Sequence, residues 1–163
     1  MRIGVLSDTH LHAATEGFRR RVEVCFAGVE MILHAGDLTE LAVLQAFGDR
    51  TVHAVHGNMC GVSARGVLPE SRVIRVGGFV IGLCHGAGPY HNVEERLWSS
   101  FGEADCIVYG HTHRPVCHRQ GPVLFVNPGS FTGTGPYGAA GTYALLEVND
   151  TIRATILEVP RLS

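Results

Sequence analysis

Short apolar runs recur along the chain, and five of them stop at a side chain that can bind a metal ion. Runs rich in Val, Ile and Leu that are bounded by Gly or Asp predict buried β-strands. The polar residues that follow these runs are Asp8 and His10, Asp37, Asn58, His85, and His111 and His113. Because they follow predicted strands, we expect these side chains to meet at one rim of a sheet.

The first half of the chain predicts strands and helices in alternation. The expected elements are a strand near 2–7, a helix over 16–27 with Thr15 as its N-cap, a strand near 30–34, a helix after Thr39 and a strand near 51–56. Strands that alternate with helices are typical of a parallel sheet.

The second half predicts mainly hairpins. The expected elements are a hairpin of 73–76 with 79–84, a helix near 93–101, a strand over 106–109, and hairpins of 116–119 with 123–126 and of 142–148 with 151–158. Together the two halves indicate a mixed α+β fold, in which two mixed sheets pack face to face with helices outside. At 163 residues and 45% hydrophobic content, the chain is expected to form a single domain over 1–163.

The glycine-rich stretch 129–141 is predicted to be a mobile loop. Its Gly133-x-Gly135-x-x-Gly138 spacing matches a dinucleotide-binding fingerprint in form only. The stretch does not join a strand to a helix in a βαβ unit, so we do not interpret it as a nucleotide site.

Composition excludes several kinds of chemistry and partner. The chain contains no lysine, which excludes a P-loop lysine and a Schiff base. A formal net charge of -2 argues against a nucleic-acid or membrane partner, and Arg19-Arg20-Arg21 is interpreted as a solvated helix face. The five cysteines form no C-x-x-C pair, which indicates reduced thiols. With no signal-peptide pattern and no long apolar span, we expect a cytoplasmic protein.

The seven polar residues form a strong candidate metal centre. Two carboxylates, four imidazoles and one carboxamide exceed the four ligands of a single zinc ion and suit two ions that share a bridge. Asp37 offers two oxygens that can bridge such ions. The alternative is that these residues only cap strands and fill turns.

The ordered motifs SDTH at 7–10, GD at 36–37, GN at 57–58, HG at 85–86 and GHTH at 110–113 resemble those of the calcineurin-like metallophosphoesterases. With NPGS at 127–130, the chain is most similar to the small single-domain YfcE-type phosphodiesterase group. The resemblance implies a four-layer αββα sandwich. It also implies that Asp8, His10, Asp37 and His113 hold one ion, and that Asp37, Asn58, His85 and His111 hold the other.

The resemblance further implies a hydrolase that cleaves small phosphodiesters, or phosphomonoesters, by attack of a hydroxide that bridges two divalent ions. Manganese is the metal we expect, with iron, zinc, nickel and cobalt as alternatives, because all of these accept mixed nitrogen and oxygen ligands. Two other functions stay open: an inert interaction scaffold of the same fold, and a nuclease. Exposed edge strands would also permit a homo-oligomer.

The chain departs from the family pattern at two positions. Met59 follows the GN motif where many relatives carry a proton-donating histidine, and a thioether cannot donate a proton. Ala87 stands where the small group tends to have a second histidine. His12 and Arg114 are therefore the candidate catalytic residues, as acid and phosphate clamp, although simple solvent exposure would also explain both. Asn127 and Ser130 are expected to shape the backbone near the site.

Overall fold

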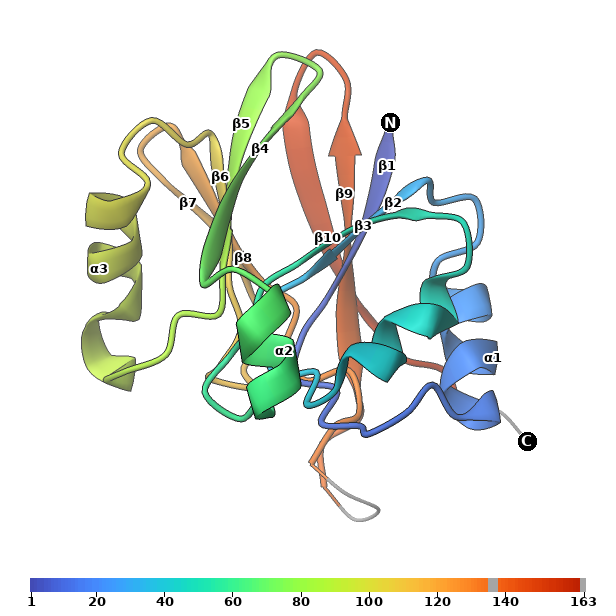
Figure 1. Cartoon of the computed structure of the whole chain (residues 1–163). Helices are drawn as coiled ribbons and strands as arrows, with labels where there is room; N and C mark the ends of the chain where they lie inside the picture. Colours follow the sequence, from blue (N-terminus) through green and yellow to red (C-terminus); the bar gives the residue numbers. More distant parts are fainter. Residues whose placement is uncertain (135–137, 162–163) are drawn as a thin grey trace.

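The computed structural model of the chain describes residues 1–134 and 138–161. Two five-stranded sheets pack face to face, and helices cover their outer surfaces (Figure 1). This four-layer arrangement confirms the predicted αββα sandwich of two mixed sheets. Residues 135–137, in the stretch predicted to be a mobile loop, lie outside the described residues.

The first sheet has the order β10-β9-β1-β2-β3. Its strands are β1 (Arg2–Leu6), β2 (Met31–His34), β3 (Thr51–Ala54), β9 (Thr142–Val148) and β10 (Ile152–Glu158). β1, β2 and β3 are parallel, with Ile3 opposite Met31 and Met31 opposite Thr51. β9 runs antiparallel to both β1 and β10, as the predicted final hairpin requires.

The second sheet has the order β4-β5-β6-β8-β7. Its strands are β4 (Ser71–Val76), β5 (Phe79–Cys84), β6 (Cys106–Val108), β7 (Val116–Gln120) and β8 (Val123–Asn127). β5, β6 and β8 are parallel, whereas β4 and β7 are antiparallel edge strands. The strands and hairpins predicted from the sequence are therefore present, with ends shifted by a residue or two.

The central strands are apolar on both faces because each face packs against another layer. In β1, Ile3 and Val5 lie in the core between the sheets, whereas Leu6 packs in the cluster beneath α1. In β6, Cys106 and Val108 lie in the same central core and Ile107 packs in the cluster beneath α3. This alternation produces the continuous apolar runs seen in the sequence.

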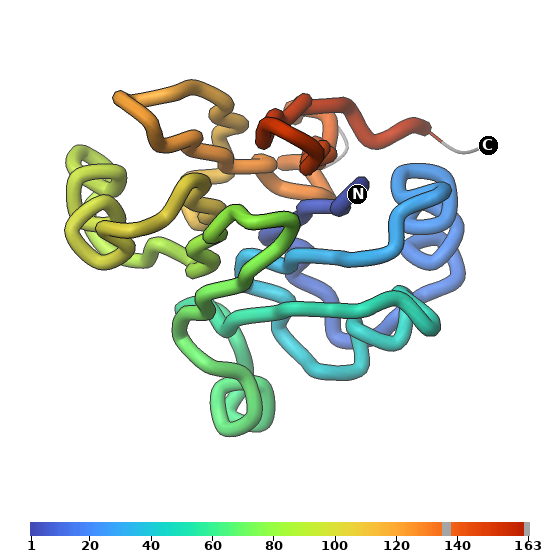
Figure 2. The backbone as a smooth tube through the Cα atoms, turned by 90° about the horizontal axis from the view of Figure 1, so that it is seen from above, coloured from blue at the N-terminus to red at the C-terminus, as the bar shows by residue number. Residues whose placement is uncertain are grey.

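Helices α1 (Glu16–Cys25) and α3 (Val93–Ser100) lie on opposite sides of the sandwich (Figure 2). The Thr15 side chain accepts a hydrogen bond from the Phe18 amide at 3.3 Å, which confirms the predicted N-cap. α1 buries Phe18, Val22 and Cys25, and ends two residues before the predicted boundary. A short helix, η2 (Tyr90–Asn92), leads into α3.

Two helical segments differ from prediction. The segment after Thr39 is the 3-10 helix η1 (Leu41–Phe47), which ends at Gly48 with a positive φ of 60°. Helix α2 (Val62–Val67) was not predicted, because its six residues bury only Ala64 and leave no amphipathic period to detect.

The two sheets present the carboxyl ends of their parallel strands at the same rim. The segments that follow β1, β2, β3, β5, β6 and β8 leave the sandwich along its lower edge in Figure 1. Backbone hydrogen bonds connect these segments, including those from Asp8 N to Gly36 O at 3.0 Å and from Gly110 N to His85 O at 3.1 Å. Ligands in open α/β sheets bind at such a rim.

Candidate metal centre

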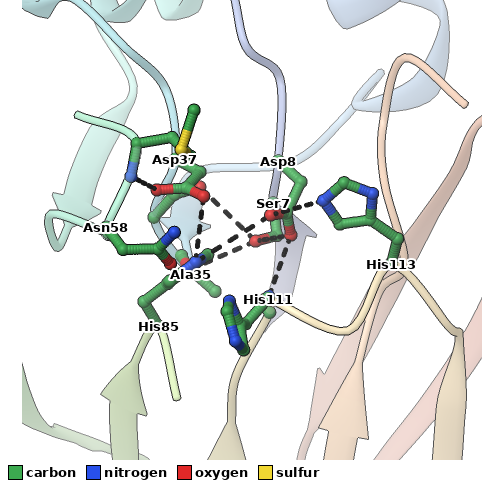
Figure 3. A network of polar contacts seen from close by, with 12 residues as sticks. Ser7, Asp8, Ala35, Asp37, Asn58, His85, His111 and His113 are labelled. Atoms are coloured by element: carbon green, nitrogen blue, oxygen red, sulfur yellow. Dashed lines mark hydrogen bonds and ion pairs between the residues drawn. The ribbon is translucent and has the colours of Figure 1, made fainter. Parts of the chain in front are cut away.

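The strand-following loops bring the predicted ligands together in one cluster (Figure 3). Two groups have ligand atoms within 4.8 Å of one another: Asp8, His10 and His113 form one group, and Asp8, Asp37 and His85 form the other. We call these the exposed group and the buried group. Asp8 belongs to both, whereas the family resemblance implied that Asp37 is the shared carboxylate.

In the buried group, one imidazole faces two carboxylates. His85 Nε2 lies 3.1 Å from Asp37 Oδ2 and 4.0 Å from Asp8 Oδ1. The other ring nitrogen, Nδ1, donates to the Ala35 carbonyl at 2.8 Å. A carbonyl can only accept, so the proton is on Nδ1 and the lone pair of a neutral ring is on Nε2. That is the tautomer a metal ligand requires.

Main-chain and hydroxyl donors occupy one oxygen of each carboxylate. The Met59 amide donates to Asp37 Oδ1 at 2.7 Å. Asp8 Oδ2 accepts from the Ser7 hydroxyl at 2.6 Å and from the His111 amide at 3.1 Å. These donors orient the carboxylates and leave Asp37 Oδ2 and Asp8 Oδ1 facing the imidazoles.

The buried donor set fits a divalent cation. Within residues 1–134 and 138–161, Asp8 Oδ1 and His85 Nε2 are both buried and make no well-aligned hydrogen bond. Their nearest polar neighbours are other candidate ligands, His113 Nε2 and Asp37 Oδ2, each at 3.1 Å. A buried carboxylate oxygen without a partner is costly. A cation between the oxygen and the nitrogen would satisfy both atoms at once, with ligands of the kinds that Mn, Fe and Zn accept.

The pKa values of Asp37 and His85 move apart because the two groups face each other. Burial by itself would raise the pKa of Asp37, but the close contact with His85 and its positive charge outweigh burial and lower that pKa. Burial would lower the pKa of His85, but Asp37 and Asp8 outweigh it and raise that pKa. Each shift favours the charged form of its group when no metal is bound, and a cation would take the place of a proton on His85.

The exposed group is more open to solvent. His113 Nε2 lies 3.1 Å and His10 Nε2 3.8 Å from Asp8 Oδ1. The two imidazole nitrogens lie 3.4 Å apart, and the ring centroids are 5.3 Å apart. Two neutral imidazoles and a carboxylate oxygen that converge in this way can share one cation.

His111 and Asn58 lie beside the buried group (Figure 3). His111 Nε2 donates to the Gly88 carbonyl at 3.2 Å, which leaves Nδ1 as the lone-pair atom, and its ring centroid lies 5.2 Å from that of His85. Asn58 is exposed and lies on the side of Asp37 and His85 in Figure 3. Their assignment to a second ion therefore remains a prediction.

Backbone strain is concentrated at the cluster. Six non-glycine residues have positive φ among the described residues, and five of them are candidate ligands: Asp8 at 53°, His10 at 48°, Asp37 at 53°, His111 at 67° and His113 at 56°. Each such conformation costs roughly 1–3 kcal/mol and persists only where surrounding contacts enforce it. The fold thus holds these side chains in unfavourable backbone geometry at one place, which is typical of a functional site.

Two motif glycines lie directly against the side chains of candidate ligands, so that no larger residue fits at these positions. A Cβ on Gly57 would collide with the side chain and amide of Asp37, and one on Gly110 would collide with the side chains of Ser7 and Asp8. The glycines of the GN and GHTH motifs therefore make room for a ligand from a different motif.

The two candidate catalytic residues lie apart from these contacts. His12 and Arg114 are both exposed, and within the described part of the chain neither side chain makes a polar contact with the cluster. Met59 is 60% exposed and contributes only its amide. The catalytic roles of His12 and Arg114 stay predictions.

Several positioning residues were not evident from the sequence. Ser7 binds Asp8, and Arg96 donates to the carbonyls of Gly86, Ala87 and Pro89, which shapes the loop that presents Gly88 to His111. The expected backbone roles of Asn127 and Ser130 are observed. Asn127 Nδ2 donates to Gly110 O at 2.7 Å, and the Ser130 hydroxyl donates to Asp8 O at 3.0 Å.

Comparisons with known proteins agree with this geometry. The family model of the calcineurin-like phosphoesterase superfamily domain matches residues 1–151. A probable metallophosphoesterase of Methanocaldococcus jannaschii is 31% identical over 163 residues, which cover 98% of this chain and 82% of that protein. A phosphodiesterase of the same organism is 26% identical over 147 residues, which cover 82% and 86% of the two chains.

The fold is also that of Vps29 of Entamoeba histolytica in complex with Zn²⁺. That structure has a TM-score of 0.74 and 24% identity, and the match covers 98% of this chain and all of the other. The chain therefore belongs to the calcineurin-like phosphoesterase superfamily. Among the described residues, no helix is both long and apolar enough to cross a membrane.

Proposed function

We propose that this protein is a metal-dependent phosphodiesterase that hydrolyses small phosphodiesters at a centre of two divalent ions. The observation that carries the proposal is the convergence of buried ligand atoms: Asp8 Oδ1 and His85 Nε2 lie 4.0 Å apart, and among the described residues neither makes a well-aligned hydrogen bond. A second set of donors, His10 and His113, shares Asp8. The phosphodiesterase among the relatives supports the reaction class.

The residues have distinct roles in this proposal. Asp8, Asp37, His85, His10 and His113 would hold the ions, with Asn58 and His111 completing the set. Bound cations supply a lowered pKa for water and positive charge opposite phosphoryl oxygens. Ala35 and Gly88 hold His85 and His111 in the tautomers that leave a lone pair free. Ser7 and the Met59 amide keep the carboxylates turned toward the imidazoles.

Protonation of the leaving group is assigned to solvent, with His12 as the side chain to test as an acid and Arg114 as the side chain to test as a phosphate clamp. Met59 has no proton to give. Arg114 lines an open cavity of about 690 Å³ together with Tyr90 and Thr112, so it can reach a substrate phosphate from that side. We therefore expect activated diesters with good leaving groups to react fastest.

Small substrates are favoured over polymers. A formal charge of -2 supplies no general attraction for a polyanion, and manganese is the metal we propose, with iron, zinc, nickel or cobalt as alternatives. The scaffold alternative rests on the fold shared with Vps29. A cytoplasmic location and a homo-oligomer stay predictions.

The test is a metal titration of the metal-stripped protein with bis(p-nitrophenyl) phosphate, alongside p-nitrophenyl phosphate and elemental analysis. We expect turnover of the diester with Mn²⁺ at two ions per chain, and slower turnover of the monoester. A folded protein that fails with Mn, Fe, Zn, Ni and Co would favour the scaffold instead. Tight, salt-sensitive binding of DNA would favour a nuclease.

A further inference from the structure

A cavity of about 410 Å³ opens directly beside the buried group of the metal centre. Its lining includes His85 and Asn58, so it begins at the candidate ligands. Its wall includes Arg65 of α2, Ser71 of β4 and Leu97 of α3, so the cavity lies between these three elements. Small-molecule sites span roughly 300–1,000 Å³, so the cavity can hold a ring system as well as a short alkyl group.

The cavity has an apolar floor and a polar rim. Cys84 and Leu97 are buried, and Phe101 is partly buried against the same apolar cluster. Ser71, Arg65 and Ser100 are exposed around them. A flat group with an apolar face and hydrogen-bonding edges matches such a surface.

Arg65 is held in a fixed orientation at the rim. Its Nε donates to the Cys60 carbonyl at 2.9 Å, and a second guanidinium nitrogen donates to the carbonyl of Asn58. Both partners are neutral carbonyls, so they hold the planar cation without cancelling its charge. A guanidinium held in this way can stack on an aromatic ring.

Glu70 and Arg96 also line the cavity. Arg96 donates to the carbonyls of Gly86, Ala87 and Pro89, so its guanidinium is engaged with the loop after β5. The wall therefore carries a carboxylate as well as guanidinium groups, and a neutral group that offers both donors and acceptors can pair with both kinds of charge.

The second cavity near the site is a poorer candidate for this role. It is larger, at about 690 Å³, but its lining includes none of the seven candidate ligands. A phosphorus atom positioned at the metal centre would have one of its ester groups nearer to the smaller cavity, because only that cavity reaches His85 and Asn58.

We propose that the smaller cavity binds one alcohol component of the phosphodiester, and that this component is a neutral, flat, nucleoside-like ring system. The inference rests on the proposed function, since it assigns a substrate class to the same site. Its physical basis is a fixed guanidinium and an apolar floor beside the candidate ligands.

The test is a substitution at an exposed strand position, which places a large side chain in the cavity. Ser71→Phe places an aromatic side chain at the rim, and aromatic residues are well accepted in strands. Val73→Phe is the matched control, because Val73 lies on the same face of β4, is 60% exposed and is not part of the cavity lining.

The two variants and the unmodified protein are compared in two measurements. The first is the binding of adenosine to metal-free protein by saturation-transfer NMR, with ribose as the probe that lacks the ring. The second is the ratio of kcat/KM for the p-nitrophenyl ester of adenosine 5′-monophosphate to that for methyl p-nitrophenyl phosphate. We expect Ser71→Phe to lower both adenosine binding and this ratio by about tenfold or more, and Val73→Phe to change neither.

The outcomes separate the two proposals. If adenosine does not bind, or if both variants behave alike, the cavity assignment is overturned while any diester hydrolysis keeps the proposed function intact. If adenosine binding is lost only in Ser71→Phe but no metal supports hydrolysis of either ester, the proposed function fails and the cavity is left as a ring-binding site.

Discussion

The buried and exposed groups of the metal centre share Asp8 but are built differently. In the buried group, Asp8, Asp37 and His85 are 0%, 2% and 3% exposed, and carbonyl, amide or hydroxyl groups fix every side chain. In the exposed group, the side chains of His10 and His113 are 33% and 38% exposed.

This difference predicts unequal affinities for the two ions. A buried, preoriented donor set gains more from a cation, because the alternative is an unsatisfied carboxylate in a poorly solvated place. Exposed imidazoles are hydrated when no ion is bound, so they gain less. We expect the buried group to fill first and to hold its ion through dialysis, and the following predictions test that order.

The largest effect is expected from Asp37→Asn. The variant keeps an oxygen that can accept from the Met59 amide but loses the charge that faces His85. Loss of a contact that merely orients a metal ligand costs roughly 10- to 100-fold in metal affinity or activity. Loss of the charge of the ligand itself should cost more, so we expect diesterase activity to fall by more than about 100-fold. Circular dichroism should show an unchanged fold.

Asp105→Asn is the matched control for this variant. Asp105 also accepts from a backbone amide, that of Val80 at 2.7 Å, but it lies outside the cluster. It should leave metal content and activity unchanged. Equal losses in the two variants would mean that Asp37 acts through folding rather than through the metal.

A smaller effect is expected from His113→Ala, which removes one ligand of the exposed group. Elemental analysis should show that bound metal falls from two ions toward one per chain, with activity lowered by roughly 10- to 100-fold. His118→Ala is the control, since His118 also faces a carboxylate, Glu94 at 3.0 Å, away from the site. If His113→Ala instead empties both positions, the two groups form one cooperative unit and the proposed order of filling is wrong.

Arg96→Gln should have a weaker effect, on the metal affinity of the buried group. The loop held by Arg96 presents Gly88 to His111, so its loosening should lower metal affinity by about tenfold without removing a ligand. Isothermal titration calorimetry can measure this change. Arg119→Gln is the control, because Arg119 also donates to two carbonyls, those of Pro122 and Ile152, at a distance from the centre. An unchanged affinity in Arg96→Gln would assign Arg96 to folding only.

The sequence predicted the sheets better than the helices. Strands such as β6 are buried on both faces, so their apolar runs report their position directly. α2 and η1 lie where loops and tertiary contacts decide the backbone, and a window of six or seven residues carries no clear period. Only the structure shows that η1 has 3-10 geometry.

The ligands were visible in the sequence because each follows a predicted strand, whereas their supports were not. Ser7 lies beside Asp8, but nothing in its sequence context distinguishes it from a serine that only forms a turn. The contact of His85 with the Ala35 carbonyl joins residues 50 positions apart through a backbone atom, which leaves no residue-type signal. For the same reason, the sequence could not show that Asp8 contributes an oxygen to both the buried and the exposed group.

The metal affinity of the buried group should also depend on pH. The two carboxylates that outweigh burial raise the pKa of His85, so the metal-free buried group carries a proton at neutral pH more readily than a free imidazole. Metal must displace that proton, so affinity should rise with pH, by less than about tenfold per unit, between about pH 6 and pH 8. Calorimetry in buffers of different ionisation enthalpy would count the released proton. A pH-independent affinity would show that His85 is neutral before metal binds.

The stability of the metal-free protein should depend on pH through a second buried imidazole, that of His34, whose pKa is lowered rather than raised. Burial, and then the nearby charge of His85, lower the pKa of His34 to about 3, and its ring contacts the Thr9 hydroxyl and the Gly36 amide. In the unfolded chain the same residue titrates near 6.5. As pH falls from about 6.5 toward 3, the unfolded state therefore binds a proton that the folded state does not, and stability falls by up to about 1.4 kcal/mol per unit.

Urea unfolding in EDTA at several pH values measures this slope, and the His34→Gln variant isolates the contribution of His34. The variant should be less stable at pH 7, because it loses a packed ring, but its stability should fall less steeply between about pH 6 and pH 4. The exposed His118→Ala variant should retain the full slope. If His34→Gln keeps that slope as well, then the acid sensitivity belongs to Asp37, because a carboxyl group whose pKa is lowered on folding also weakens the fold as pH falls.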